Sequence, residues 1–175
     1  MKNILKIFII AAGFVLFFNV NSFALVDVAA WGGYVFKGDA DGVDFDSGGQ
    51  YGFKGHYNTS LVPLFDLGIG AYYQYSKLKF DKFGFYNFSR KTAGFDVNFI
   101  LSLPIIHPYV RGTWAFMDKV ESVNKRFKTY GIGAGVELGF LPFISLFGEY
   151  MYEKSNHKYA DITSNAVNFG LKLDI

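Results

Sequence analysis

Long stretches of the chain alternate apolar and polar residues with a period of two. In residues 65–77 (FDLGIGAYYQYSK) every second side chain is apolar, and the positions between them are mostly glycine or polar. Residues 91–102 and 129–140 repeat this pattern, and on the polar side of the first only Ile100 breaks it. Because successive side chains of a β-strand point to opposite faces of its sheet, the pattern predicts strands with one apolar and one polar face.

Three of the four prolines lie in short apolar connections between such segments. Pro63, Pro104 and Pro142 recur at a near-regular interval of about 40 residues, which indicates a repeated structural unit. Each unit holds a strand, a long polar connection, a returning strand and a tight turn. Four long connections alternating with three short turns require eight strands. We predict them at 26–37, 49–60, 65–77, 91–102, 107–118, 127–139, 143–153 and 164–175.

The two faces of these strands differ in size as well as polarity. The polar face carries glycines and isolated charges, for example Gly131, Gly133 and Gly135, whereas the other face is rich in Phe, Leu and Tyr. Eight strands enclose a lumen that side chains just fill, so small residues fit its concave side and large ones its convex side. A closed barrel also leaves no unpaired backbone edge in lipid. We predict an all-β fold, an eight-stranded antiparallel transmembrane β-barrel with up-and-down meander topology.

Aromatic residues cluster near the predicted strand ends. Tyr73, Tyr75 and Trp114 lie toward the long connections, and Phe65 and Phe143 lie toward the proline turns. Amphipathic rings are stable at the level of lipid headgroups, so the clusters are interpreted as two interface girdles. The alternative is a set of cross-strand aromatic pairs in a soluble sheet.

Residues 1–24 have the organisation of an export signal. A short basic start (1–6) precedes an unbroken run of 12 apolar residues (7–18), and small residues stand at Ser22 and Ala24. The apolar run is shorter than the roughly 20 residues that span a bilayer as a helix. We expect cleavage after Ala24, which leaves residues 25–175 as one barrel domain.

The composition narrows the class of protein. Aromatic residues make up 20% of the chain and charged residues 18%, a balance unlike that of a disordered segment or a coiled coil. There is no cysteine, so the chain forms no disulfide and offers no thiolate to a metal. Without Lys2 and Lys6 of the signal, 15 basic residues balance 15 acidic ones. A globally basic nucleic-acid-binding protein is therefore not indicated, and no nucleic-acid partner is expected.

Three segments carry a resemblance to a known family. The strand TYGIGAGVELGF, the following LFGEYMY and the terminal VNFGLKLDI resemble the small bacterial outer-membrane barrels of the OmpA/OmpX and opacity-protein type. The resemblance implies location in the bacterial outer membrane and insertion by the barrel-assembly machinery. The positions of that family's carboxyl-terminal assembly signal are occupied here by Asn168, Gly170, Leu173 and Ile175, where Ile175 stands in place of the usual Phe.

Ionisable residues on the polar face are expected inside the barrel. An unpaired charge in such a place is costly, so we expect ion pairs. Counting heights from the proline turns places Arg111 near Glu137, Lys54 in one layer with Asp96, and Lys172 beside the strands of Glu149 and Asp27. The hypothesis is an ion-pair network that plugs the lumen, and the alternative is a gated ion path through the same residues. The network comprises Asp27, Lys54, Asp96, Arg111, Glu137, Glu149 and Lys172.

Two long connections have a distinctive charge. A basic and aromatic connection suits lipid phosphates or surface glycans, and its alternative is ordinary solvated charge. The acidic connection 38–49 resembles a calcium loop but fails the EF-hand count, because Gly48 stands where the final carboxylate is needed. Its aspartates are Asp39, Asp41, Asp44 and Asp46. The basic and aromatic set is Lys77, Lys79, Lys82, Phe83, Phe85, Tyr86, Arg90 and Lys91.

No familiar catalytic motif is present. The chain lacks GxSxG, HExxH, Walker and GxGxxG patterns, so no enzymatic activity, metal or cofactor is expected. A lipid A-modifying hydrolase is kept as an alternative, since Ser155, Ser164 and His157 with Glu153 or Asp161 supply its residue types. A narrow porin-like channel is another.

The expected function is non-enzymatic. The barrel would support the envelope and present surface loops for interaction or adhesion. Its expected partners are outer-membrane lipids including lipopolysaccharide, the barrel-assembly machinery, and surface glycans or host molecules. We expect a monomer.

Overall fold

Ten β-strands account for nearly all residues that the computed structural model describes, namely 25–40, 43–45, 47–80, 86–120, 125–126, 128–141, 143–157 and 160–175. The expected signal, 1–24, lies outside them. No helix among these residues is long and apolar enough to cross a membrane. The strands are β1 (Val26–Ala40), β2 (Val43–Phe45), β3 (Ser47–Val62), β4 (Phe65–Phe80), β5 (Tyr86–Leu101), β6 (Ile106–Val120), β7 (Lys125–Arg126), β8 (Lys128–Leu141), β9 (Ile144–His157) and β10 (Ala160–Asp174).

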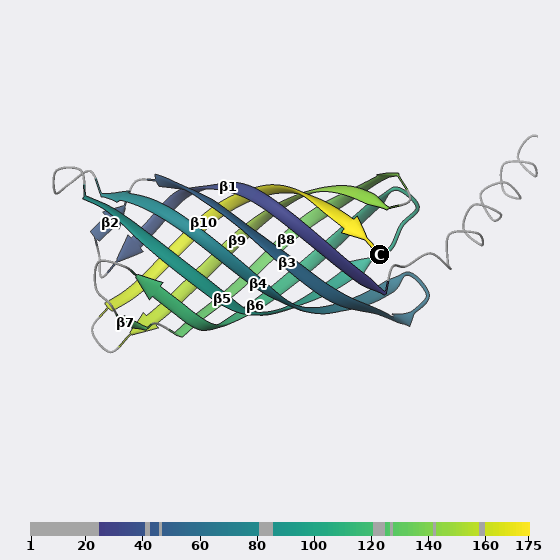
Figure 1. The fold of residues 1–175 in the computed structure, drawn as a ribbon, viewed down its shortest axis with the longest axis horizontal. Helices are drawn as coiled ribbons and strands as arrows, with labels where there is room; N and C mark the ends of the chain where they lie inside the picture. Colours follow the sequence, from purple (N-terminus) through teal and green to yellow (C-terminus); the bar gives the residue numbers. More distant parts are fainter. Residues whose placement is uncertain are drawn as a thin grey trace, which may run out of the picture.

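Eight long strands close into a barrel (Figure 1). Each is antiparallel to its neighbours in the order β1, β3, β4, β5, β6, β8, β9, β10, and β10 returns to pair with β1. That last ladder runs from Asp27 opposite Asp174 to Ala40 opposite Ile162, so the barrel has no open edge. The short strands β2 and β7 pair with β1 and β6 and lie at one end of the barrel, here called the loop end (Figure 1). The predicted all-β meander is confirmed.

The strands are longer at the loop end than the sequence pattern predicts. β4 continues past residue 77 to Phe80, β5 begins at Tyr86 instead of residue 91, and β9 continues past residue 153 to His157. From Phe65 to Tyr75 the outward face of β4 is apolar, a rise of about 25 Å at the usual strand rise and barrel tilt, which matches the apolar band of membrane barrels. Backbone pairing thus continues beyond the band, where outward side chains become polar.

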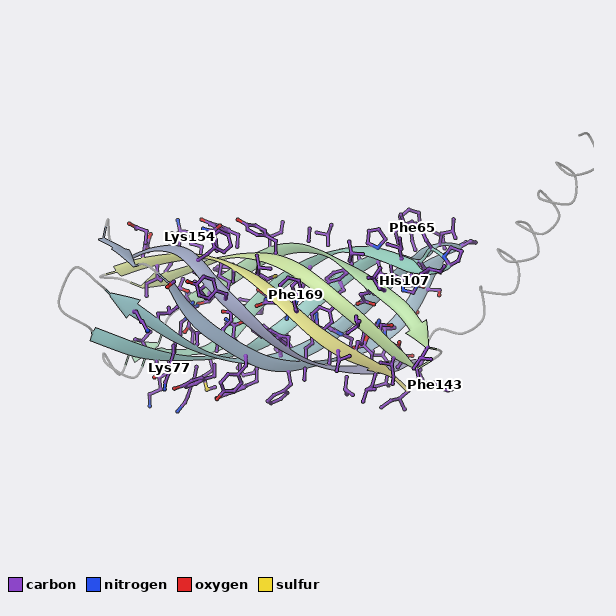
Figure 2. All side chains as sticks on the ribbon, turned by 90° about the horizontal axis from the view of Figure 1, so that it is seen from above. Phe65, Lys77, His107, Phe143, Lys154 and Phe169 are labelled. Carbon is purple, nitrogen blue, oxygen red and sulfur yellow. The ribbon has the colours of Figure 1, made fainter. Side chains whose placement is uncertain are left out.

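Burial is inverted relative to a soluble protein. Along β4, Asp66, Tyr72 and Gln74 are buried, whereas Phe65 and Ile69 are exposed. Large apolar side chains cover most of the outside of the barrel (Figure 2), for example Phe169 at 67% exposure and Phe143 at 69%. The prediction that the apolar face points outward is confirmed.

A β-bulge changes which residues of β6 face the lumen. The register of β5 and β6 shifts between Ala93 and Gly94, so that Phe116 is the extra residue on β6. Before the bulge Ala115 is buried, and beyond it Asp118 is buried while Lys119 is exposed. The bulge therefore turns Asp118 into the lumen and Lys119 toward the outside.

Tight turns join the strands at the opposite end, here called the turn end. The turn between β3 and β4 consists of Pro63 and Leu64. Leu64 has a φ of 73°, the one positive φ at a non-glycine position among the described residues. This left-handed conformation is strained for a residue with a Cβ atom.

Candidate functional site in the lumen

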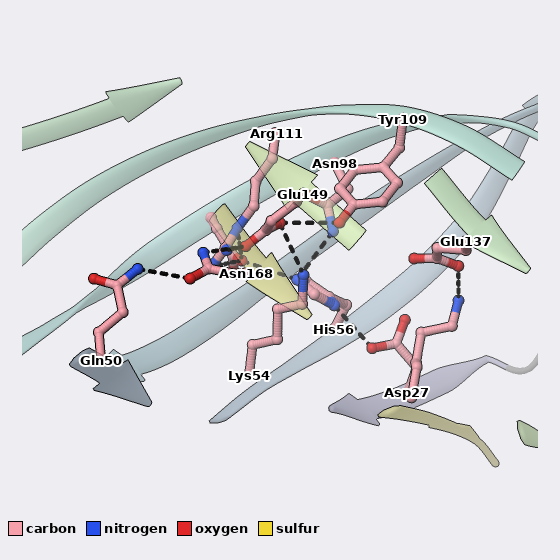
Figure 3. A network of polar contacts seen from close by, with 12 residues as sticks. Asp27, Gln50, Lys54, His56, Asn98, Tyr109, Arg111, Glu137, Glu149 and Asn168 are labelled. Atoms are coloured by element: carbon pink, nitrogen blue, oxygen red, sulfur yellow. Dashed lines mark hydrogen bonds and ion pairs between the residues drawn. The ribbon is translucent and has the colours of Figure 1, made fainter. Parts of the chain in front are cut away.

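The middle of the lumen holds a compact group of ionised side chains, here called the central cluster: Arg111, Asp96, Glu149, Lys54, His56 and Asp27 (Figure 3). Arg111 lies at its centre. Its Nε donates to Asp96 Oδ2 at 2.9 Å, and its Nη1 donates to Glu149 Oε1 at 2.8 Å. Lys54 Nζ lies 3.5 Å from Glu149 Oε2. Every member is 3% exposed or less, so the charges are compensated by each other and by the lumen wall.

His56 bridges two carboxylates of the central cluster. Its Nδ1 lies 2.8 Å from Asp27 Oδ1 and its Nε2 lies 3.0 Å from Asp96 Oδ2. An imidazolium, with an N–H on each ring nitrogen, satisfies both contacts. With His56 in this form, three cations face three carboxylates. Asn58 Nδ2 donates a further bond to Asp27 at 2.8 Å.

Neutral side chains extend the central cluster along the barrel. Tyr109 donates to Glu149 at 2.9 Å, and Asn168 donates to the same carboxylate at 3.1 Å. Gln50 donates to Asn168 at 2.6 Å, and Gln74 donates to Gln50 at 3.2 Å. Two of these bonds join neighbouring strands and two reach across one intervening strand, so the polar residues brace the inside of the barrel wall.

Aromatic rings line the wall around the cations. The guanidinium carbon of Arg111 lies 5.6 Å from the ring centre of Trp31 and 5.2 Å from that of Tyr72. Lys54 Nζ lies 4.4 Å from the ring centre of Phe147. Such contacts stabilise buried cations while they fill space. The lumen at this level is therefore packed by rings and ion pairs.

A second group, here called the upper cluster, lies nearer the loop end and consists of Arg90, Asp118, Glu153, Thr129 and Ser155. Arg90 donates to Asp118 through Nε at 2.9 Å and Nη2 at 2.7 Å. Its Nη1 donates to Glu153 at 3.2 Å, and its Nη2 also donates to Ser155 at 2.6 Å. Thr129 donates to Asp118. The cluster joins β5, β6, β8 and β9 where the barrel extends past the apolar band.

Two smaller groups lie toward the turn end. Lys172 pairs with Glu137 and lies 3.4 Å from Asp174 Oδ1. Asp66 accepts bonds from Ser60, at 2.5 Å, and from Ser102. Polar interactions therefore occur along the whole length of the lumen.

The pairing differs from the one expected from heights along the strands. Arg111 reaches Asp96 and Glu149 instead of Glu137. Lys54 reaches Glu149 instead of Asp96, and Lys172 reaches Glu137. The physical reason is side-chain length, because Arg111 and Lys54 cross the lumen to β9, which is not adjacent to β6 or β3. Counting along adjacent strands misses such contacts.

The basic and aromatic set is divided by the barrel wall. Arg90 was expected in a surface connection but lies in the lumen, where it is 2% exposed. Lys77, Lys79 and Lys91 lie on the outward face. The predicted strand began at Lys91, with Thr92 facing inward. Extending its alternation back by one residue would have placed Arg90 on the inward face as well. The remaining members, Lys82, Phe83, Phe85 and the side chain of Tyr86, lie outside the described residues.

The described residues of the expected hydrolase alternative are divided between the lumen and the outside of the barrel. Ser155 and Glu153 contact Arg90 in the lumen, and Ser164 is buried there as well. Asp161 is on the outside, 3.9 Å from Lys154 Nζ. The side chain of His157 lies outside the described residues.

The residues considered as metal ligands, including the acidic connection 38–49, are described only in part. The described residues contain no group of three or more His, Asp or Glu suited to a metal ion. Asp39 pairs in register with Asp44 in the β1–β2 hairpin. Asp41, Asp46 and the side chain of Asp44 lie outside the description.

The carboxyl-terminal residues seal the barrel. Asn168 belongs to the hydrogen-bond network of the lumen. A Cβ atom on Gly170 would lie 2.6 Å from the ring of Phe147, so only glycine fits there. Leu173 and Ile175 are exposed on the outside at the turn end, with exposures of 47% and 74%. The last strand thus contributes to the lumen, to the closing ladder and to the apolar surface.

Comparisons by sequence find no relative. No family model matches the chain, and no curated protein sequence matches it. Solved structures do match. Neisserial surface protein A aligns with a TM-score of 0.65 at 14% identity, over 86% of this chain and 97% of that one.

The attachment invasion locus protein Ail of Yersinia pestis is a second structural neighbour. It aligns with a TM-score of 0.54 at 12% identity, over 86% of this chain and 99% of Ail. A structure of Ail in complex with the heparin analogue sucrose octasulfate aligns with a TM-score of 0.53 at 13% identity, over 85% and 98% of the two chains. At these identities the likeness concerns the fold.

Fold and lumen together define the class of protein. The chain has the fold of the small eight-stranded outer-membrane β-barrels, with an apolar outer wall and a lumen filled by paired charges.

Proposed function

We propose that the protein is an integral protein of the bacterial outer membrane with a structural, non-enzymatic role. The observation that carries this proposal is the inverted burial, with ion pairs inside a closed barrel and large apolar side chains outside it. Only a lipid environment stabilises an outer wall of this kind without aggregation. The loops at the loop end would face the outside of the cell and the tight turns the periplasm.

We propose further that the lumen is plugged. Asp96, Arg111 and Glu149 span the barrel at mid-height, and none is more than 3% exposed. Two guanidinium bonds and the aromatic rings around them leave these charges almost no exposed surface. A barrel of this size is normally filled by its own side chains.

The second candidate is a narrow channel, and one observation favours it. The buried ionisable residues that the structure describes comprise seven Asp and Glu against four Lys and Arg plus His56. A transient opening of the central cluster would therefore conduct cations in preference to anions.

Planar-bilayer recording separates the two candidates. We expect no steady conductance from the folded wild-type protein, and brief cation-selective openings in an Arg111→Ala variant. Steady wild-type openings that are lost in Arg111→Ala would favour the channel over the plug. A Lys91→Ala variant, changed on the outward face, is the control for the preparation.

Insertion and surface contact complete the proposal. Residues Asn168, Gly170, Leu173 and Ile175 would be read by the barrel-assembly machinery after removal of the signal at Ala24. The long loops would contact surface glycans or host molecules, and the outer wall would contact lipids including lipopolysaccharide, with the protein acting as a monomer.

Cell fractionation tests the location. The full-length gene product should appear in the outer-membrane fraction, with a mature mass beginning at Leu25 and with gel mobility that changes on boiling. Recovery in the soluble periplasm would contradict the proposal. An unchanged acyl pattern of lipid A with and without the gene is expected, and an altered pattern would support the hydrolase alternative instead.

A further inference from the structure

We propose that the lumen binds a calcium ion near its turn end, at Asp66 and the polar side chains around it. These are Ser60, Ser102 and Asn58, and the group is here called the Asp66 site. Asp66 directly follows Phe65, which lies at the turn end of the barrel (Figure 2). The proposal goes beyond the proposed function and does not depend on cellular location, because it concerns the inside of the closed barrel.

Asp66 is a buried carboxylate that contacts no Lys, Arg or His in the part of the chain that the structure describes. It is 3% exposed, and its hydrogen-bond partners are the hydroxyl groups of Ser60 and Ser102. Lys172, at the same end of the lumen, already pairs with Glu137 and Asp174. The other buried acidic side chains each lie within ion-pair distance of a cation, namely Asp27, Asp96, Asp118, Glu137, Glu149 and Glu153. An uncompensated buried charge is costly, so Asp66 requires a cation from solution.

The charge balance of the whole lumen favours a divalent cation. The buried ionisable side chains that the structure describes comprise seven Asp and Glu against four Lys and Arg, and His56 adds a fifth positive charge as an imidazolium. Seven minus five leaves an excess of two negative charges, which one divalent cation balances. The central cluster contributes nothing to this excess, since three cations face three carboxylates there.

Two serines hold the carboxylate of Asp66 in one orientation. Ser60 Oγ donates to Oδ1 at 2.5 Å, and Ser102 Oγ donates to Oδ2. An ionised carboxylate accepts about four hydrogen bonds, so each oxygen keeps a lone pair for a metal ion. Hydrogen bonds that orient a ligating carboxylate in this way are typical of metal sites. Ser60 is exposed, so an ion can reach the group from the solvent at the turn end.

A second oxygen ligand, the amide oxygen of Asn58, lies beside Asp66 over a glycine. Asn58 is opposite Gly68 on β4, two residues from Asp66. Its Nδ2 donates to Asp27, and its Oδ1 is directed over Gly68, where a Cβ atom would lie 2.8 Å from that oxygen. Asn58 and Asp66 are diagonal neighbours, about 7–8 Å apart. Calcium, with bonds of about 2.3–2.6 Å, joins oxygen atoms up to about 5 Å apart.

The ligand set suits calcium better than magnesium. Carboxylate and amide oxygens are ligands of hard cations. Calcium accepts them in flexible geometry and completes its coordination with water, whereas magnesium requires a nearly ideal octahedron. Because the site holds a single carboxylate, its dissociation constant should be about 10⁻⁴–10⁻³ M, the range of extracellular calcium modules.

NMR titration of the isotope-labelled protein with calcium chloride tests the assignment. The protein is refolded in a non-ionic detergent without lipopolysaccharide, in about 0.15 M NaCl to screen diffuse attraction. The backbone amides of Ser60, Asp66 and Ser102 and the side-chain amide of Asn58 should shift in a saturable way. Magnesium chloride at the same concentrations should cause smaller shifts.

Four variants separate the site from general charge effects. Asp66→Asn keeps the shape of the side chain, removes its charge and should weaken calcium binding about tenfold or more. Asp174→Asn removes the same charge at the same end, where Lys172 keeps Glu137, and should leave the affinity within about twofold. Gly68→Ala changes no charge but places a methyl group beside the Asn58 oxygen, and it should also weaken binding. Gly112→Ala, on the outward face, is its control.

Unfolding in urea adds a readout that a purely structural role of Asp66 would not give. Calcium at about 10 mM should raise the urea midpoint of the wild type, because it binds the folded state. The midpoint of Asp66→Asn should not respond to calcium. Heat-modifiable mobility shows that each variant is folded, and Gly68→Ala serves if Asp66→Asn is not.

Three results would overturn the assignment. They are the absence of saturable shifts at the Asp66 site, wild-type calcium affinity in Asp66→Asn, and an equal loss of affinity in Asp174→Asn. The first would mean that the two hydroxyl groups are sufficient partners for Asp66. The last would mean that calcium is attracted diffusely to the acidic end of the lumen. Because the titration uses purified protein, its result is independent of the fractionation experiment that tests cellular location.

Discussion

Arg90 and Asp118 form a two-bond ion pair inside the loop end of the barrel, with Nε and Nη2 of Arg90 donating at 2.9 and 2.7 Å. The pair joins β5 to β6 above the apolar band. Lys91, the next residue after Arg90, points outward. Neighbouring basic residues thus lie on opposite sides of one wall, Arg90 in the lumen and Lys91 on the outward face.

Breaking this pair should destabilise the barrel. Arg90→Ala or Asp118→Ala leaves a buried partner uncompensated, which costs about 3–5 kcal/mol. The double variant should recover part of the loss of Arg90→Ala, because Asp118 is removed with its cation and only Glu153 remains without one. Urea unfolding in lipid vesicles, followed by heat-modifiable mobility, gives the free energies.

Lys91→Ala is the matched control for these variants. It removes a neighbouring positive charge from the outward face and should change the unfolding free energy by less than about 1 kcal/mol. If Arg90→Ala and Lys91→Ala were equally mild, Arg90 would not be a buried brace.

His56 should stabilise the barrel by compensating the two carboxylates that it bridges. His56→Leu leaves Asp27 and Asp96 without their shared donor and should cost about 3–5 kcal/mol. Adding Asp27→Asn removes one of the stranded charges and should restore part of the stability. No recovery in the double variant would show that the loss comes from packing instead of charge.

Gly135 should not tolerate a side chain. A Cβ atom there would lie 2.5 Å from the ring of Tyr109, so Gly135→Ala should cost about 1–3 kcal/mol by overpacking. Gly112 faces outward with nothing within 4 Å, and Gly112→Ala should be tolerated. Combining Gly135→Ala with Tyr109→Ala should reduce the additional cost of the alanine, as measured by the same unfolding assay. A fully additive double variant would contradict the contact.

Leu64 should be stabilised by replacement with glycine. Its φ of 73° costs a residue with a Cβ atom about 1–2 kcal/mol, and glycine adopts this conformation freely. Part of the gain is lost to the greater chain entropy of glycine, so Leu64→Gly should gain up to about 1 kcal/mol. Leu64→Ala keeps the Cβ atom and should show no such gain. Equal stability of the two variants would argue against backbone strain.

The alternation of residues predicted the fold and the inward direction of most lumen residues. It worked because Phe65, Asp66 and their successors on β4 obey a strict period of two while the strand crosses the membrane. It underestimated strand length because the alternation of hydrophobicity ends near Lys77, although backbone pairing continues to Phe80.

The upper cluster could not be predicted in full. The bulge at Phe116 shifts the alternation of β6, so Asp118 has the sequence position of an outward residue and the structure of an inward one. Which carboxylate each cation reaches also depends on side chains that cross the lumen, as Arg111 does to Glu149. The alternation of apolar and polar residues along one strand reveals neither a bulge nor a side-chain contact with a non-adjacent strand.

Spin labelling along β4 tests the central claim most directly, and the absence of cysteine makes single-cysteine variants simple to prepare. Labels at Ile69, Ala71 and Tyr73 in lipid vesicles should be accessible to oxygen, which partitions into the bilayer, and shielded from a water-soluble nickel chelate. Labels at Tyr72 and Gln74 should be shielded from both. Accessibility to the nickel chelate at the first three positions, or no alternation along the strand, would contradict a barrel with its apolar wall in lipid and its charges sealed within.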